Sequence, residues 1–227
     1  VTPSIGRMVL YAFIGTSDGI PISNSLLEDN QVGLATLLPE MLGTRIGRLK
    51  NKKGTIGAGV ASSEPDGIVP QSTLGKTAAS NAAIVLDEIT DLTHAVDPDI
   101  RRMHECKFMF TDQTLKLFRK IKDSEGRYLW QVDARSGAPD TLFEYAYVVN
   151  QNMAEIGATT KSVIFGNFMS YKWRDVIGSG NQQGIRLAVL RELYAESDQT
   201  GYQAFARFDG RLLNPGDNPV VHLIHPA

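Results

Sequence analysis

The stretch QVGLATLLPEMLGTRIGRLKNKK, residues 31–53, carries the strongest periodic signal in the sequence. Its apolar residues recur at steps of three and four, at Leu34, Leu37, Leu38, Met41, Leu42, Ile46 and Leu49. This spacing predicts an amphipathic helix over about residues 31–52, with one face against the rest of the protein. Basic residues crowd its C-terminal end, where cations favour the helix dipole. Pro39 and Gly43 interrupt the pattern, so we expect Pro39 to kink the helix or to end a first short one.

The residues before this helix predict an extended segment and a cap. Residues 7–14 are rich in β-branched and aromatic side chains and are typical of a strand. Gly15 to Gly19 predicts a turn, after which Ile20–Ile22 resumes an extended path. Ser23 or Asn24 is then the expected N-cap of a helix that has Glu28 in its early turns.

The rest of the chain changes from helices to strands. Residues 54–70 are rich in Gly, Ser and Pro and are the best candidate for a domain boundary. A helical stripe follows from Val85 to Val96, then a strand at 107–110 and a helix capped by Thr111 or Asp112. Further strands are expected at 143–149, 162–168, 171–176, 185–193, 202–208 and 219–224. This order predicts the α+β class with mostly antiparallel pairing.

Composition excludes several classes of protein. The 227 residues include 23 Lys plus Arg and 25 Asp plus Glu, a net charge of −2, which argues against a module that binds nucleic acid through a basic stripe. A steep salt dependence of DNA binding would revive that hypothesis. No apolar run reaches the ~18 residues of a membrane span, and residues 1–6 do not form a signal peptide. The chain begins with Val1, so we expect a further segment upstream.

A search for catalytic and metal-binding residues finds no convincing set. Gly54, Gly57 and Gly59 follow a helix and lack the Gly-Lys-Ser/Thr ending of a phosphate loop, so they predict a surface loop. His104 lies two residues from Cys106, the single cysteine. The pair defines an enzyme hypothesis, a small hydrolase, although a packed thiol and a surface imidazole fit better. His222 and His225 lack metal-site spacing. We therefore expect no catalytic residue, cofactor or metal.

Several segments, taken in order, resemble one known family. Residues 20–30 (IPISNSLLEDN) with the long helix are similar to the opening of tailed-bacteriophage major capsid proteins, which have the Hong Kong 97-type fold. The blocks GAG and PDGIV, the run DSEGRYLWQ at 123–131 and the segment FEYAYVVN match in turn. IFGNFMSY at 164–171 and FARFDGRLLNP at 205–215 complete the pattern. The last two blocks resemble phage capsid proteins more than encapsulin nanocompartment shells, which share the fold and remain the alternative.

The resemblance implies a division of the chain into five parts. Residues 1–22 are expected to be the returning half of an extended loop, and 23–69 the spine helix and glycine loop of a peripheral domain. Residues 70–178 would form the axial domain, 179–213 the peripheral sheet and 214–227 a final axial strand. Some relatives join subunits through a lysine of the extended loop, but residues 1–22 contain no lysine. Covalent cross-linking is therefore not expected.

The resemblance also implies partners and contact residues. The chain is expected to assemble with copies of itself into pentamers and hexamers of an icosahedral head shell. That shell would enclose double-stranded DNA without sequence-specific binding. Scaffold, portal and decoration proteins are the further partners; the location is the virion capsid, after assembly in the host cytoplasm, with no membrane. The expected subunit contacts are Leu10, Tyr11, Phe13, Leu34, Leu38, Met41, Leu42, Tyr171 and Trp173. For Tyr171 and Trp173, core packing is an equal alternative.

Overall fold

The computed structural model describes residues 8–29, 34–103, 105–122, 125–126, 141–176, 184–213 and 217–227, without the side chains of 34–36 and 103. The chain forms two compact units. Unit 1 comprises Val1–Asp66 and Trp173–Arg211, and unit 2 comprises Gly67–Lys172 and Leu212–Ala227. The chain first passes from unit 1 to unit 2 after Asp66, within the stretch rich in Gly, Ser and Pro.

The sheet of unit 1 is built around one long strand, β10 (Gln199–Leu212). On one edge β10 pairs antiparallel with β9 (Ile185–Leu190). On the other edge it pairs antiparallel with β1 (Phe13–Thr16) and β2 (Ile20–Ser23). The two edges are distinct because Phe205 pairs with both Arg186 of β9 and Thr16 of β1. β8 (Tyr171–Asp175) pairs with β10 as well.

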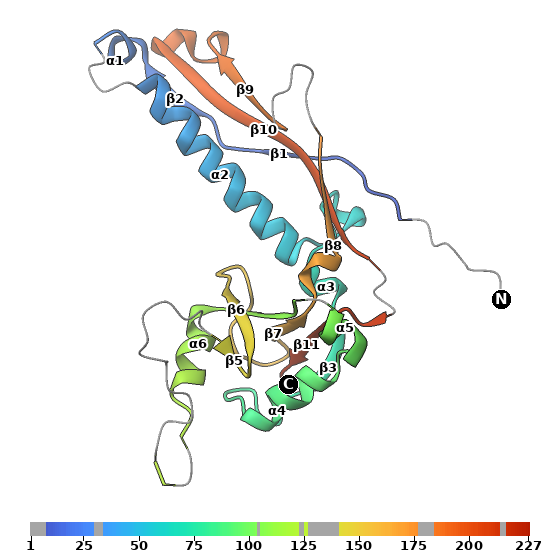
Figure 1. Ribbon diagram of the computed structural model, residues 1–227. Helices are drawn as coiled ribbons and strands as arrows, with labels where there is room; N and C mark the ends of the chain where they lie inside the picture. Colours follow the sequence, from blue (N-terminus) through green and yellow to red (C-terminus); the bar gives the residue numbers. More distant parts are fainter. Residues whose placement is uncertain are drawn as a thin grey trace, which may run out of the picture. The chain divides into compact units, whose positions relative to one another are not determined.

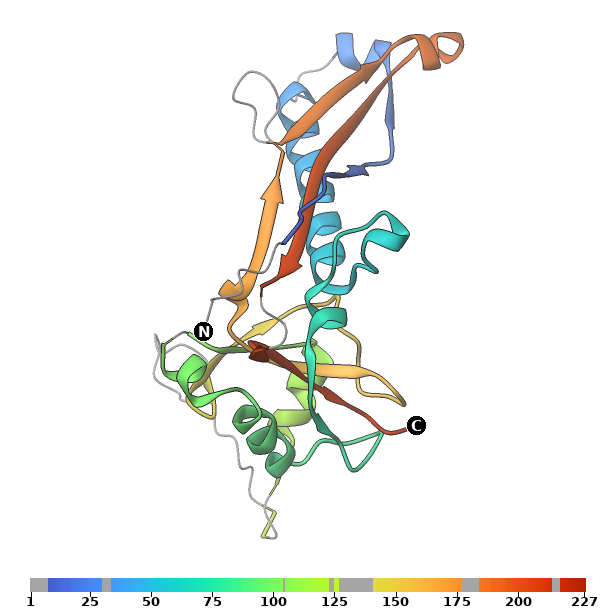
Figure 2. The ribbon, with the colours of Figure 1, turned by 90° about the vertical axis from the view of Figure 1, so that its right-hand side faces the viewer.

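The long helix α2 (Leu34–Ile56) lies along β10 (Figures 1 and 2). Its residues Leu42 and Ile46 are buried against Ala204, Ala206 and Phe208 of the strand. Each fully buried aliphatic side chain stabilises such a contact by about 1.5–3 kcal/mol. The predicted helix is thus confirmed, although it runs four residues further. Pro39 lies inside α2, so the helix continues through this residue and Pro39 does not end a first short helix.

The N-terminal strand is shorter than residues 7–14 predict. β1 begins only at Phe13, and residues 8–12 have no regular structure. In this segment the backbone N–H of Tyr11 donates to the carboxylate Oδ2 of Asp209 at 2.6 Å, so this N–H is bonded to a side chain and not to a neighbouring strand. Ser23 stands at the predicted N-cap position of the short helix α1 (Asn24–Glu28), but its side chain accepts no backbone N–H of the helix.

Unit 2 contains a six-stranded mixed sheet. Its order is β3 (Thr73–Thr77), β11 (Val220–Ile224), β7 (Lys161–Gly166), β4 (Lys107–Phe110), β6 (Tyr145–Val149) and β5 (Thr141–Leu142). β11 with β3 and β4 with β6 are parallel, and the other pairs are antiparallel. The α+β class with mostly antiparallel pairing is therefore confirmed. β3 and β5 were not predicted from the sequence.

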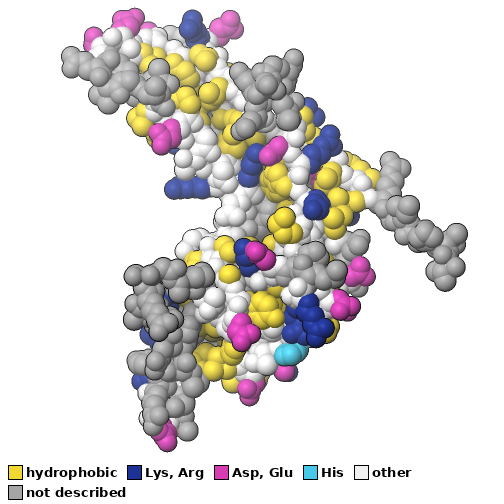
Figure 3. All heavy atoms as spheres, in the orientation of Figure 1, with side chains coloured by type: hydrophobic (Ala, Val, Ile, Leu, Met, Phe, Trp, Pro, Cys, Tyr) yellow, Lys and Arg dark blue, Asp and Glu magenta, His cyan; other side chains and the backbone are white. Residues whose placement is uncertain are grey.

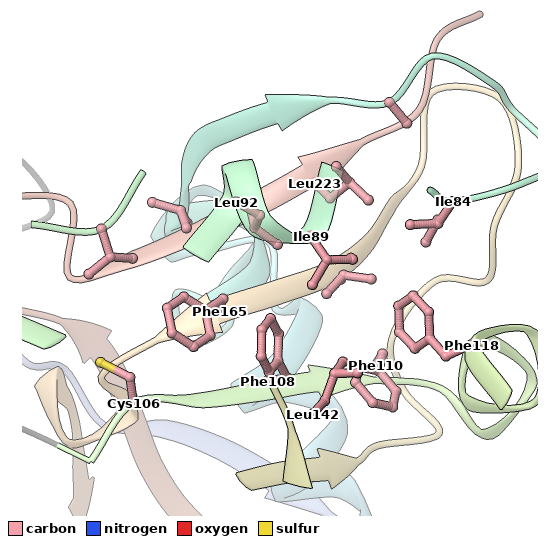
Figure 4. Packing of buried hydrophobic residues seen from close by; sticks show 14 of the residues in the cluster. Ile84, Ile89, Leu92, Cys106, Phe108, Phe110, Phe118, Leu142, Phe165 and Leu223 are labelled. Atoms are coloured by element: carbon pink, nitrogen blue, oxygen red, sulfur yellow. The ribbon is translucent and has the colours of Figure 1, made fainter. Parts of the chain in front are cut away.

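Helices α4 (Leu86–His94), α5 (Pro98–Met103) and α6 (Asp112–Arg119) share one core cluster with this sheet. Helix α3 (Ile68–Gln71) and the single turn η2 (Phe168–Ser170) belong to a second cluster of unit 2. The single turn η1 (Val60–Ser62) lies in unit 1. Ile89 and Leu92 of α4 point toward Phe108 and Phe165 of the strands (Figure 4). Thr111 caps α6 as predicted, its hydroxyl accepting the N–H of Thr114 at 3.2 Å. α3 and α5 were missed.

Candidate subunit-contact surfaces

Helix α2 has two neighbouring apolar stripes, and only one of them is buried. Leu38 and Leu42 are 5% and 1% exposed, so they are core residues of unit 1. They therefore leave little free surface for the subunit contact that the sequence predicts for them. Leu37 and Met41, one residue earlier in each turn, are 45% and 43% exposed. The side chain of Leu34 lies outside the described residues.

The exposed face of α2 changes character along its length. After Leu37 and Met41, steps of four, three and four residues lead to Arg45, Arg48 and Lys52, all exposed. This spacing keeps the five residues on one face. The outward face of α2, defined by these residues, is therefore apolar in its first half and basic in its second.

Residues 10–14, which lead into β1 and form its first half, also present apolar side chains. Tyr11 is 45% exposed and Ile14 67%, while Leu10 and Phe13 are half-buried. The Tyr11 and Phe13 rings lie with centroids 5.9 Å apart. Arg174 Nη1 donates to the Leu10 carbonyl at 2.7 Å, which fixes the backbone here. Of the three predicted residues, Tyr11 thus offers the most free surface.

The side chains of Trp173 and Tyr171 pack mainly against residues of their own chain. Trp173 stacks on Phe208 with ring centroids 5.3 Å apart and an angle of 17°. Tyr171 is half-buried against a cluster of unit 2 that includes Ile68 and Leu212. Core packing accounts for both, while part of each side chain stays accessible.

The glycine-rich stretch after α2 is an ordered loop of unit 1. Gly57 N donates to the Lys53 carbonyl at 2.9 Å, and Gly59 N donates to the Pro65 carbonyl at 3.2 Å. A Cβ at Gly57 would lie 2.2 Å from the Pro65 oxygen, so only glycine fits. Lys53 pairs with Glu64, and Lys50 lies 2.6 Å from Asp175. These two lysines are tied to the loop and sheet and do not form a free basic patch.

Strand β9 and the turn after it add apolar surface that the sequence did not single out. Leu187 and Val189 are 45% and 51% exposed, and the outer edge of β9 pairs with no described strand. Leu193, in the 3-10 helix η3 (Glu192–Ser197), is 70% exposed. Figure 3 shows apolar and basic side chains mixed over one face of unit 1. An unpaired edge and exposed leucines are typical of surfaces that another chain covers.

Unit 2 has its own exposed apolar residues at the β5–β6 hairpin. Phe143 is 42% exposed and lies in the turn, where it and Glu144 have positive φ angles of 49° and 71°. Val148 and Val149 of β6 are about as exposed, at 41% and 38%. The sequence carries a signal for this exposed surface, because consecutive apolar residues lie on both faces of β6, whereas apolar and polar residues normally alternate in a half-buried strand.

Of the two residues considered for catalysis, the structure describes Cys106, which is buried. Cys106 is 4% exposed and burial raises the pKa of its thiol, whereas His104 lies outside the described residues. His225 Nε2 lies 2.6 Å from Ser162 Oγ, but the two residues are 2% and 0% exposed, so no substrate reaches them. Among the described residues no group of three potential metal ligands occurs, and no helix is long and apolar enough to span a membrane.

The comparisons with known proteins agree on one family. The sequence profile of the phage capsid family matches residues 17–223. The chain belongs to the phage capsid family. No curated protein sequence matches the capsid chain. Its structure is similar to the capsid of a native GTA particle computed with C5 symmetry, at a TM-score of 0.82 and 22% identity, over 100% of this chain and 76% of that one.

Structures of phages agree at lower identity. Gordonia phage Cozz matches at a TM-score of 0.68 with 14% identity, over 100% of this capsid chain and 77% of that one. Mycobacterium phage Bobi matches at 0.67 with 16% identity, over 96% and 73%. The resemblance predicted from the sequence is confirmed. The capsid chain is a structural shell protein and not an enzyme, and the family match favours a phage shell over an encapsulin shell.

Proposed function

We propose that this capsid protein assembles with copies of itself into pentamers and hexamers, which form an icosahedral head shell around double-stranded DNA. The observation that carries the proposal is the family match over residues 17–223. The similar GTA particle capsid computed with C5 symmetry supports a ring arrangement.

The exposed apolar residues give the physical reason for self-assembly. Tyr11, Ile14, Met41, Val189 and Leu193 are each more than a third exposed on unit 1. Covering such residues removes apolar area from water at about 25 cal/mol per Å². In a closed symmetric assembly the same patches are reused in every copy, so modest contacts add up to a stable shell.

The two units support a domain assignment. In this proposal unit 1 is the peripheral domain, with residues 1–22 as the returning half of the extended loop and α2 as the spine helix. Unit 2 is the axial domain, which gathers at the five-fold and six-fold axes, and residues 214–227 contribute its last strand. The boundaries of the compact units at 66/67, 172/173 and 211/212 lie within six residues of the proposed ones at 69/70, 178/179 and 213/214.

The remaining partners follow from the same proposal. The net charge of −2 suits a container that holds DNA without gripping its phosphates, since strong binding requires many cationic contacts. Scaffold and portal proteins, and a decoration protein, would complete a virion capsid that is assembled in the host cytoplasm.

The test is negative-stain electron microscopy of the purified protein, with mass photometry on the same sample. We expect closed shells or rings of five and six subunits. A monomer at every concentration and salt level would refute self-assembly of this chain. Shells that co-purify with an enzyme cargo and no DNA would instead favour a nanocompartment.

A further inference from the structure

An open pocket of about 620 Å³ lies in unit 1 between the turn from β1 to β2 and the outward face of α2. The turn contributes residues 16–21, and α2 contributes Arg45 and Arg48. These arginines are three residues apart and therefore share one helix face. No described side chain forms an ion pair with either guanidinium group. Their N–H donors are available to an acidic group from outside the chain.

The turn that forms the pocket wall is held rigidly on β10. Ser17 N donates to the Ala204 carbonyl at 2.9 Å, and Ser17 Oγ accepts the N–H of Ala204 at 2.9 Å. The Gln203 side-chain amide donates to the Ser17 carbonyl at 3.0 Å. A pocket whose wall is fixed before binding loses little conformational entropy when it is filled.

The acidic turn η3 lies beside this pocket in the same unit. Glu192 and Glu196 are exposed on either side of Leu193, which is 70% exposed. η3 lies close to the turn, because the hydroxyl of its Tyr194 would be only 3.3 Å from a Cβ placed on Gly19. Its C-terminal end is fixed because Asn24 Nδ2 donates to Asp198 Oδ1 at 2.7 Å. No described cation pairs with either glutamate.

We propose that η3 of a second copy docks on the outward face of α2. Its two glutamates pair with Arg45 and Arg48, and its Leu193 covers Met41. Glu192 to Glu196 spans about 8 Å along a 3-10 helix and Arg45 to Arg48 about 5 Å along an α-helix, a difference that the long, flexible glutamate and arginine side chains can span. Because one chain presents both partners side by side, two copies can exchange them reciprocally, as a self-complementary interface requires. This contact rests on the proposed shell function and names one of its interfaces.

The surroundings of the arginines favour a protein partner over DNA. Leu37 and Met41 continue the same helix face with exposed apolar side chains, which a phosphate backbone leaves uncovered. A protein segment that carries both carboxylates and a leucine can pair with the basic half of the outward face of α2 and cover its apolar half.

The first experiment is a mixed cross-link, performed on the protein with Cys106→Ala as background. Met41→Cys and Leu193→Cys are purified separately, mixed as subunits and assembled under mild oxidation. We expect a disulfide-linked dimer on a non-reducing gel from the mixture and none from either variant alone. Shells that form from the mixture without this dimer would overturn the contact.

The second experiment exchanges the charges. Arg45→Glu with Arg48→Glu, and Glu192→Arg with Glu196→Arg, are each expected to lower shell yield about tenfold or more, because like charges then face each other. The four substitutions combined restore the yield. Lys52→Glu, on the same helix face beyond the pocket, is the matched control and assembles like the parent protein. Circular dichroism melts check that each variant folds.

The outcomes separate this contact from the proposed function. A parent protein that forms no oligomer refutes the shell proposal itself. A parent that assembles while the Arg45→Glu, Arg48→Glu variant assembles equally well refutes only the η3 contact. Normal assembly of that variant together with loss of salt-dependent binding to a duplex DNA fragment would reassign the arginines to phosphate binding.

Discussion

Replacing Leu42 by alanine tests whether the buried stripe of α2 holds unit 1 together. Leu42 is 1% exposed against Ala204, Ala206 and Phe208. The substitution removes three buried carbon atoms, worth about 0.8 kcal/mol each. The cavity that remains adds to this loss. We therefore expect the free energy of unfolding to fall by about 3 kcal/mol.

Tryptophan fluorescence during urea unfolding measures this loss. Trp173 stacks on Phe208, which belongs to the same cluster as Leu42, so in a Trp130→Phe background its emission reports on unit 1. With a urea dependence of about 2 kcal/mol per M, the midpoint is expected to fall by about 1.5 M. Met41→Ala is the matched control: Met41 is adjacent in the helix but 43% exposed, and its midpoint is expected to stay within about 0.3 M. Equal midpoints for the two variants would refute the assignment of the buried stripe.

Three further predictions concern a buried histidine, a glycine and the cysteine. Burial lowers the pKa of His222 to about 4, so the folded protein holds it neutral. Stability from this residue is present above its unfolded pKa of about 6.5 and is lost as the pH falls toward 4, by roughly 2–3 kcal/mol at pH 4.5. The urea midpoints at pH 7 and pH 4.5 should therefore differ less in His222→Gln than in the parent protein, and an equal difference contradicts this. Gly57→Ala is expected to lower the melting temperature by several degrees through the clash with Pro65, whereas Gly47→Ala, which meets no atom within 4 Å, should not lower it. Cys106 is buried with a raised thiol pKa and should react with a thiol reagent only in denaturant; rapid reaction of the native protein would show that unit 2 opens here.

Sequence signals succeeded where a local pattern decides the structure. The strand at Lys107–Phe110 and the cap at Thr111 are found as predicted, because alternation and a hydroxyl acceptor act within a few residues. α3 and β5 were missed because elements of four and two residues are too short to show a period.

Distant contacts explain the remaining differences. Tyr11, which was expected in a strand, donates its backbone N–H to Asp209, 198 positions away, and no local pattern indicates that bond. On α2 the apolar residues form a band wide enough for two stripes. The sequence therefore indicated a helix with an apolar face, but not that Leu42 packs inward while Met41 remains outside.

The long central strand of unit 1 is synthesised late, and this determines when unit 1 can fold. The residues that cover Leu42 and Ile46 come from Ala204 to Phe208, so all of residues 67–172 leave the ribosome before unit 1 can close. Such non-local pairing is slow, because a long loop must close before the contact forms. During synthesis the apolar stripe of α2 therefore has no sheet to cover it, and this half of the molecule becomes complete only when the strand near the end of the described chain arrives.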